Sequence, residues 1–224
     1  SVAKDEYEEC LTKAAFLTAS KGQFDLFETL GWTPADGFHL LDRHLERLTH
    51  SATYFGFRFD ENEIRTFLDQ LVEDQSEARR IKLLLSRSGA ISGQAQSMPP
   101  SPKQPVPIKL SAIQVNSADP FLYHKTTKRD VYTQAASDKD AFEHLLSNER
   151  GEITEGCFTN LFVQKHGQLY TPKLECGLLP GILRAELLAQ GTYKEHTLYI
   201  DDLKNADALF IGNSLRGLLS AKLI

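Results

Sequence analysis

Residues 142–190 read FEHLLSNERGEITEGCFTNLFVQKHGQLYTPKLECGLLPGILRAELLAQ, and this stretch decides the fold class. Three short apolar runs separated by turn residues predict three successive strands: 142–147, 153–164 and 168–171. A helix is expected next over residues 180–190, because Pro180 lies near its start and Gly191 follows its end. Strands that follow one another directly and are then joined by a helix indicate an α+β protein.

The residues before this stretch also contain strand and helix patterns. Alternating apolar and polar residues predict a strand over 23–32, and turn residues follow at 34–37. One-face apolar stripes predict a helix over 41–56 and a second helix from Asp60, where Glu63 resembles the second half of a capping box. Two further strands and a short helix are expected: 80–86, 106–115 and 128–136.

The remaining segments suggest how the chain is divided. Residues 88–105 contain two Gly and four Pro, so we expect an irregular loop there. A helical lead-in is expected over 5–19. The pattern pauses at 117–123, and we place a boundary there between an N-terminal α+β subdomain (1–118) and a C-terminal subdomain (119–224). The junction of two such halves is the expected place for a binding cleft.

The composition is that of a folded protein. Hydrophobic residues make up 41% and charged residues 25% of the chain, which excludes complete disorder. A net charge of -5 argues against nucleic acid or an anionic membrane as the main partner. No apolar run reaches the roughly 20 residues that a membrane helix needs. The three cysteines have no C-x-x-C spacing and the histidines no ligand spacing, so we expect no disulfide framework, no metal and a cytoplasmic location.

Two glycine-containing segments have the pattern of phosphate-binding loops. Residues 177–184 (GLLPGILR) open the expected helix, and the free amides of a first helical turn favour an anion. Residues 212–214 (GNS) form a second short loop of this kind. Arg47 would add a charge-assisted contact if its side chain turned inward. The alternatives are an ordinary loop-to-helix turn, an ordinary loop and a solvated helix face.

Lys125 and Glu155 are the candidates for covalent and acid–base chemistry. A lysine in a cleft with cationic neighbours has a lowered pKa and can act as a Schiff-base nucleophile and proton carrier. A buried carboxylate at position 155 needs a partner, such as a pyridinium nitrogen. The alternatives are a surface lysine and a surface acid beside a turn. The absence of a Walker-type or G-x-G-x-x-G motif disfavours nucleotide binding by those routes.

Taken together and in order, these segments resemble the class IV aminotransferase family, the fold-type IV pyridoxal 5'-phosphate (PLP) enzymes. This family comprises branched-chain and D-amino-acid aminotransferases and 4-amino-4-deoxychorismate lyase. The resemblance covers residues 20–224 and lies in a series of short motifs: Phe27-Glu28-Thr29, His44-Leu45-Glu46-Arg47-Leu48, His124-Lys125, Glu155-Gly156, Asn160-Leu161-Phe162, Tyr170-Thr171-Pro172, 179–184 and Asn213-Ser214. It implies a two-subdomain fold like that of D-amino-acid aminotransferase, with PLP in the cleft between the subdomains.

The resemblance also implies roles for individual residues. Lys125 matches the lysine that forms a Schiff base with PLP and moves protons. Glu155 matches the acid that pairs with the pyridine nitrogen, and a protonated pyridine makes the ring an electron sink. Four groups match the phosphate cup: Arg47, the backbone amides of Ile182 and Leu183, and Ser214.

Within the family, the motifs favour the lyase. Residues 88–93 replace the Arg-x-His pair of D-amino-acid aminotransferases, and they lack the aromatic residues usual in the branched-chain enzymes. Four segments instead resemble the lyase domains fused behind aminodeoxychorismate synthase: 24–30, 124–132, 148–156 and 213–217. Lys128 departs from the asparagine of several relatives, which puts the hydrogen bonds around Lys125 in doubt.

The resemblance therefore implies a lyase that forms 4-aminobenzoate and releases pyruvate in folate biosynthesis. The alternative is an aminotransferase for small or branched-chain amino acids, and a third interpretation is an inactive scaffold within a larger synthase. Because the lyase substrate has two carboxylates, guanidinium groups are its expected partners, with structural ion pairs as the alternative role: Arg87, Arg129 and Arg216. Thr29 is expected to face the substrate, or else to pack inward.

The resemblance implies partners as well as a substrate. The family forms homodimers whose sites lie near the interface, so a homodimer is expected. A component of aminodeoxychorismate synthase is a further expected partner, because the segments named above resemble fused domains and the chain begins at Ser1, with Met98 as its one methionine.

Overall fold

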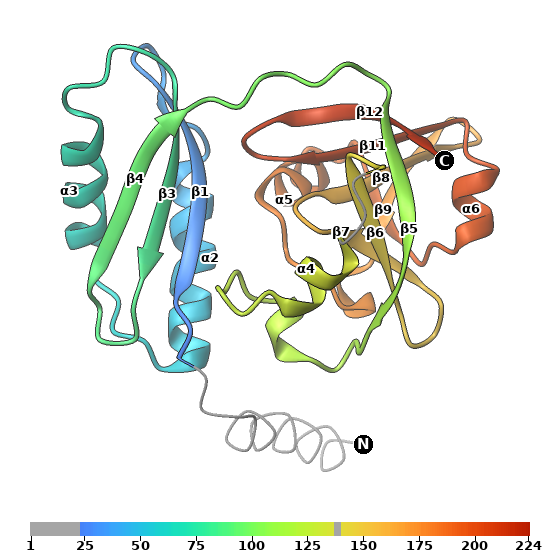
Figure 1. Ribbon diagram of the computed structural model, residues 1–224, viewed down its shortest axis with the longest axis horizontal. Helices are drawn as coiled ribbons and strands as arrows, with labels where there is room; N and C mark the ends of the chain where they lie inside the picture. Colours follow the sequence, from blue (N-terminus) through green and yellow to red (C-terminus); the bar gives the residue numbers. More distant parts are fainter. Residues whose placement is uncertain (1–22, 137–139) are drawn as a thin grey trace.

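The computed structural model describes residues 23–136 and 140–224 (Figure 1). Two β-sheets, each with its own hydrophobic core, lie side by side and are joined by a long connection between β4 (Ile91–Ser97) and β5 (Val106–Val115). The architecture is α+β, as the sequence predicts. The lead-in helix expected over 5–19 lies outside the described residues.

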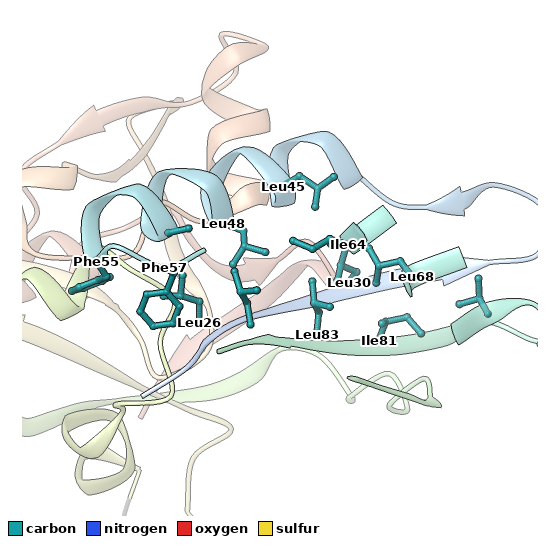
Figure 2. Close-up of a cluster of buried hydrophobic side chains, with 13 residues drawn as sticks. Leu26, Leu30, Leu45, Leu48, Phe55, Phe57, Ile64, Leu68, Ile81 and Leu83 are labelled. Atoms are coloured by element: carbon teal, nitrogen blue, oxygen red, sulfur yellow. The ribbon is translucent and has the colours of Figure 1, made fainter. Parts of the chain in front are cut away.

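The first sheet has the strand order β2-β1-β3-β4, and two helices cover one of its faces (Figure 1). Besides β4 its elements are β1 (Leu26–Thr33), β2 (Gly37–Phe38), β3 (Arg79–Leu85), α2 (Leu41–Phe55) and α3 (Glu61–Val72). The apolar stripes of both helices pack on Leu26, Leu30 and Ile81, as Figure 2 shows. Asp60 accepts a hydrogen bond from the amide of Glu63 at 3.0 Å, so the predicted helix start is confirmed.

The second sheet carries eight strands among the described residues, in the order β10-β9-β8-β11-β12-β5-β6-β7. Besides β5 they are β6 (Glu143–Asn148), β7 (Ile153–Gly156), β8 (Asn160–Lys165), β9 (Gln168–Pro172), β10 (Lys194–His196), β11 (Ala208–Asn213) and β12 (Gly217–Leu223). Short helices connect them: η1 (Pro120–Leu122), α4 (Asp130–Ala135), η2 (Leu174–Cys176), α5 (Ile182–Ala189) and α6 (Ile200–Lys204). Leu145, Leu161 and Ile211 are completely buried in the core of this sheet.

Strand β4 corrects the expectation of an irregular loop over residues 88–105. The strand pairs antiparallel with β3, and Ile91 and Ala95 pack against the first core. Gly93 lies so close to β3 that an added Cβ atom would approach the carbonyl oxygen of Lys82 to 2.7 Å. The sequence pattern misses this edge strand because its Gly, Ser and Gln residues leave only a small apolar face.

A second correction concerns the strand expected over 153–164, which the structure divides into β7 and β8. Between them, the amides of Cys157 and Phe158 donate to the buried carboxylate of Glu143, at 2.8 and 3.1 Å. These amides therefore leave the sheet ladder, and the chain turns at this point. Thr159 completes the turn by donating its hydroxyl hydrogen to the same carboxylate at 2.8 Å.

The chain passes from the first sheet to the second at residues 98–105, upstream of the boundary expected at 117–123. The prolines of this connection have no N–H group to donate to a sheet ladder, which keeps most of it outside both sheets. β5 belongs to the second sheet as a result. After η1 the chain returns to the first sheet, where the amide of Phe27 donates to the carbonyl of Lys125 at 3.0 Å.

The helices, the possible metal-ligating side chains and the cysteines of residues 23–136 and 140–224 have the following properties. None of the helices there has the length and apolar character needed to cross a membrane. The same residues contain no group of three His, Cys, Asp or Glu side chains placed to hold a metal ion. Cys157 and Cys176 are buried free thiols.

Candidate active site

A cleft of about 340 Å³ lies between the two sheets. Its walls come from β1, β3 and α2 on one side and from β7, β8, β11 and the start of α5 on the other. The two faces of strand β1 have different neighbours. Leu26 and Leu30 face the helices of the first core, whereas Phe27 and Thr29 face the cleft. Eight of the residues named from the sequence line the cleft: Thr29, Arg47, Lys125, Arg129, Glu155, Ile182, Ser214 and Arg216.

Lys125 presents its amine to this cleft. Its Nζ atom lies 4.6 Å from the centroid of the Phe27 ring, and its carbonyl accepts the amide hydrogen of the same residue. Desolvation in the cleft, together with the positive charges of Arg47 and Arg129, lowers the pKa of Lys125 to about 7. A substantial share of such an amine is unprotonated at neutral pH, as a nucleophile or proton acceptor requires.

Glu155 lies on β7 and is buried against the same cleft. Burial raises the pKa of Glu155 to about 7, although its hydrogen bonds and the charge of Arg129 oppose this rise. Its Oε1 atom accepts from the hydroxyl of Tyr132 at 2.8 Å and from the amide of Leu179 at 3.1 Å. Its Oε2 atom accepts from Asn160 at 3.2 Å. These hydrogen bonds fix the position of the carboxylate, and a positively charged partner would favour its ionised form.

The start of α5 forms one wall of the cleft. The first helical turn has amides without helical partners, and an anion is stabilised at such a position. The loop approaches β8 closely, since a Cβ atom added to Gly181 would lie 1.7 Å from Oδ1 of Asn160. Arg47 binds the same loop by donating to the carbonyl of Pro180 at 3.1 Å. Ile182 and Ser214 also line this part of the cleft.

A buried polar cluster behind this wall was not assigned a role from the sequence. Glu28 accepts two hydrogen bonds from Arg47, at 2.9 and 2.6 Å, and one from His44 at 2.7 Å. Burial opposes its ionisation, but Arg47 and His44 outweigh this effect and lower the pKa of Glu28 to about 2. The sequence contains a signal for this cluster. Glu28 alternates with Leu26 and Leu30 along β1, so its side chain points into the core, where a carboxylate needs hydrogen-bonding partners.

The cleft contains one arginine that the sequence interpretation did not name, Arg80. Arg129 donates to the carbonyl of Cys157, and its guanidinium carbon lies 3.9 Å from the centroid of the Tyr132 ring. Arg216 donates to the carbonyl of Pro100 at 3.1 Å. Arg80, on β3, also lines the cleft. The strand alternation of β3 is the signal for Arg80, because its neighbour Ile81 points into the helix-covered core.

Among the residues named from the sequence, Arg87 and the side chain of Leu183 do not line the cleft. Arg87 follows β3 and donates to the carbonyl of Phe55, at the end of α2, at 2.8 Å. Its guanidinium carbon lies 4.9 Å from the centroid of the Phe57 ring. Arg87 therefore contacts a carbonyl and an aromatic ring of the first subdomain, which is neither the substrate contact nor the ion pair considered from the sequence. The side chain of Leu183 packs toward Gly212, while its backbone amide, the group named from the sequence, lies in the first turn of α5.

The residues present fit a phosphorylated pyridine aldehyde. The cleft offers an amine of low pKa at Lys125 and a buried carboxylate at Glu155 for a ring nitrogen. The close approach of Gly181 to Asn160 leaves room only for glycine beside the first-turn amides. The guanidinium group of Arg47 and the hydroxyl group of Ser214 line the cleft as well. These donor types match those expected of a PLP phosphate cup.

The sequence model of the amino-transferase class IV family matches residues 25–224 of this chain. The chain belongs to this family. Class IV aminotransferases are PLP-dependent enzymes, and the two-sheet α+β architecture is their fold. The family and the fold class that the sequence motifs imply are therefore confirmed.

Class IV relatives of two kinds are similar to this chain. A Schizosaccharomyces pombe protein, provisionally named an aminodeoxychorismate lyase, is 34% identical over 212 residues, which is 89% of this chain and 90% of that protein. A Mesorhizobium loti crystal structure, provisionally named an amino-acid aminotransferase, has a TM-score of 0.86 at 45% identity and covers 90% of this chain and 100% of its own. A Legionella pneumophila structure, provisionally named a 4-amino-4-deoxychorismate lyase, has a TM-score of 0.82 at 27% identity and covers 90% and 83%.

Proposed function

We propose that this chain is a PLP-dependent 4-amino-4-deoxychorismate lyase, which forms 4-aminobenzoate and releases pyruvate for folate biosynthesis. The observation that carries the proposal is that the cleft of Lys125 contains three arginines besides the one in the phosphate cup: Arg80, Arg129 and Arg216. The substrate has two carboxylates, and guanidinium groups match carboxylates in shape and charge. The similarity to the S. pombe protein that is provisionally named an aminodeoxychorismate lyase supports the same assignment.

Different residues of the cleft would hold different parts of PLP. Lys125 would bind it covalently through Nζ, and Glu155 would pair with the ring nitrogen. Arg47, Ser214 and the first-turn amides of α5 would bind its phosphate. When bound, PLP supplies an electron sink conjugated to the amine-bearing carbon of the substrate.

The side chains of this protein then position the substrate and move its proton. With the substrate in the cleft, the free Nζ atom of Lys125 would accept the proton from the amine-bearing carbon. An amine with a pKa of about 7 is suited to this transfer near neutral pH. Departure of the enolpyruvyl group, which is reprotonated as pyruvate, makes the ring aromatic. That step is strongly downhill, so alignment of the C–H bond with Lys125 is the main task of the protein.

The test is an assay of the purified, PLP-loaded chain with 4-amino-4-deoxychorismate. We expect 4-aminobenzoate and pyruvate in equal amounts, and we expect Lys125→Ala to abolish both. Lys173→Ala is the matched control, because this lysine lies on the surface beside Glu175, away from the cleft residues. Full turnover by Lys125→Ala, or no product from the parent chain, would contradict the lyase proposal.

An aminotransferase acting on small or branched-chain amino acids is the second candidate. The 45% identity to the M. loti structure, provisionally named an amino-acid aminotransferase, favours it. The same enzyme incubated with single amino acids separates the two functions. Accumulation of the pyridoxamine form together with a 2-oxo acid, without 4-aminobenzoate formation, would assign the chain as an aminotransferase.

We also propose that the chain acts as a homodimer and that an aminodeoxychorismate synthase supplies its substrate. Sedimentation of the PLP-loaded chain tests the first point, with a mass of twice 25.1 kDa expected. A coupled assay with a synthase and chorismate tests the second. A single protomer in solution would contradict the homodimer, and no gain in 4-aminobenzoate over the synthase alone would contradict the supply.

A further inference from the structure

A chain of hydrogen bonds connects the expected phosphate cup to a buried carboxylate. Glu28 on β1 lies 2.7 Å from Nδ1 of His44, which is on α2. The other ring nitrogen of His44, Nε2, lies 3.0 Å from the hydroxyl oxygen of Ser214, which follows β11 and lines the cleft. Glu28 and His44 are each 1% exposed. The hydroxyl at the cleft is therefore linked, through one imidazole, to a group that solvent does not reach.

The direction of these hydrogen bonds follows from the charge of Glu28. Arg47 donates two N–H groups to this carboxylate, which keeps it ionised. An ionised carboxylate only accepts hydrogen bonds, so the hydrogen on Nδ1 of His44 belongs to that contact. A neutral imidazole then has a lone pair on Nε2. Ser214 must donate its one hydroxyl hydrogen to that lone pair.

This direction is unsuitable for binding an anion. A phosphate dianion offers only acceptor oxygens, and Ser214 would face it with oxygen lone pairs alone. A proton on Nε2 of His44 removes the conflict, because Nε2–H then donates to the serine oxygen. The hydroxyl hydrogen of Ser214 is released and can donate to the phosphate.

The charges around His44 favour the neutral imidazole until an anion arrives. The charged groups that face it are Glu28, Arg47 and Lys125, and Arg47 already balances Glu28. Burial, with the positive charges of Arg47 and Lys125, lowers the pKa of His44 despite the attraction of Glu28. A dianion next to Ser214 adds negative charge and so favours the protonated ring.

We propose that His44 is a positioning residue that takes up one proton when a phosphate group binds in the cup, and thereby turns the hydroxyl hydrogen of Ser214 toward that phosphate. The inference rests on the proposed function only in its phosphate cup. It does not depend on which reaction the enzyme catalyses or on which substrate it accepts.

The test uses the cofactor-free chain and pyridoxine 5'-phosphate, which has the phosphate but no aldehyde to react with Lys125. Nitrogen-15 NMR of the seven histidine rings follows Nε2 of His44, whose signal is assigned by its loss in His44→Gln. We expect an unprotonated Nε2 in the free chain and a protonated one in the complex. An unprotonated Nε2 in the complex would overturn the proposal.

Calorimetry gives a second measurement that a purely structural role of His44 would not change. Binding is measured at one pH in two buffers with different heats of ionisation, which counts the protons taken up. We expect the parent chain and the control His39→Gln to take up about one proton more than His44→Gln. His39 is exposed, so this control repeats the chemical change away from the cup. Equal uptake by parent and His44→Gln would contradict the proposal.

The pH dependence of binding makes the same point above pH 7, where the phosphate ester is a dianion. Lys125 and Glu155 titrate near pH 7 in both chains, so the comparison is between slopes. The dissociation constant of the parent complex should rise with pH more steeply than that of His44→Gln, by up to about tenfold per pH unit, while His44 must be protonated on binding. Absence of any binding would contradict the phosphate cup itself, and with it the proposed cofactor site. Binding without proton uptake by the parent chain would overturn only the role of His44, and calorimetry of the parent chain detects this outcome even if His44→Gln does not fold.

Discussion

Tyr132 donates its hydroxyl hydrogen to Oε1 of Glu155 over 2.8 Å, and both groups are buried. The bond joins α4 to β7, so the small helix after Lys125 holds the carboxylate that faces the expected ring nitrogen. Burial raises the pKa of Glu155, and this hydrogen bond opposes the rise. The tyrosine therefore favours the ionised carboxylate that a pyridinium needs.

Tyr132→Phe should weaken PLP binding about tenfold, because a hydrogen bond to a charged group contributes about 1.5–3 kcal/mol. The pKa of Glu155 should rise further in this variant. Titration of the cofactor-free chain with PLP, followed by absorbance, measures the loss. Tyr123→Phe is the matched control, since its hydroxyl donates to the carbonyl of Ser117. Equal losses in the two variants would show that Tyr132 acts only through packing.

Gly181→Ala should abolish tight PLP binding. The added Cβ atom would lie 1.7 Å from Oδ1 of Asn160, which must then move away from Glu155 and from the carbonyl of Leu179. We expect a fall in affinity of at least a hundredfold. Gly31→Ala is the control, because its added Cβ atom would lie 3.5 Å from Cδ1 of Leu215, which is an ordinary van der Waals contact. Retained affinity in Gly181→Ala would contradict the close packing of this loop.

Lys125→Met should change how stability depends on pH. The pKa of Lys125 falls from 10.5 to about 7 on folding, so between these values the unfolded chain binds more protons than the folded one. The stability of the cofactor-free parent should therefore rise from pH 7 to pH 9 by roughly 2 kcal/mol more than that of Lys125→Met. Urea denaturation at both pH values measures this, with Lys173→Met as control. Parallel pH profiles of parent and Lys125→Met would contradict the lowered pKa.

Glu143→Ala should destabilise the chain by about 3 kcal/mol or more. It removes the acceptor for the amides of Cys157 and Phe158 and for the hydroxyl of Thr159, and each unsatisfied buried donor costs about 1–3 kcal/mol. Urea denaturation gives the free energy of unfolding. Glu61→Ala, which removes an exposed partner of an arginine on α3, should cost no more than about 1 kcal/mol. A similar small loss in Glu143→Ala would mean that the turn finds other partners.

Arg216→Met should change the KM of the enzyme, whereas Arg87→Met should change its stability. Arg216 lines the cleft, so its loss should raise the KM for the dicarboxylate substrate about tenfold. Arg87 holds the end of α2 through Phe55, so its loss should lower stability and leave KM unchanged. Steady-state kinetics and urea denaturation of both variants give the comparison. A raised KM in Arg87→Met would indicate that Arg87 contributes to substrate binding, as the sequence interpretation expected.

Elements with a strong local pattern could be predicted from the sequence, and elements defined by their neighbours could not. The apolar stripes of α2 and α3 and the Pro and Gly residues around α5 are local signals. β4 and β12 form because β3, β5 and β11 offer partners, and their own residues show only weak alternation. The turn between β7 and β8 depends on Glu143, which lies on another strand.

The candidate site shows the same limit. The family resemblance implied roles for Lys125, Glu155 and Arg47, and the cleft brings the three residues together. The sequence interpretation named Arg87 and not Arg80, although Arg80 faces the cleft from β3 and Arg87 follows the end of that strand. The direction of β3 in the folded chain decides which of the two arginines lines the cleft.

The main chain of Lys125 is hydrogen-bonded to β1, whereas Glu155 belongs to the second sheet. A ligand attached to the lysine and resting on the acid would cross-link two hydrophobic cores that otherwise share few strand contacts. Its binding free energy would then be lost when either core unfolds, so a saturating ligand should make the melting of the two halves a single cooperative event.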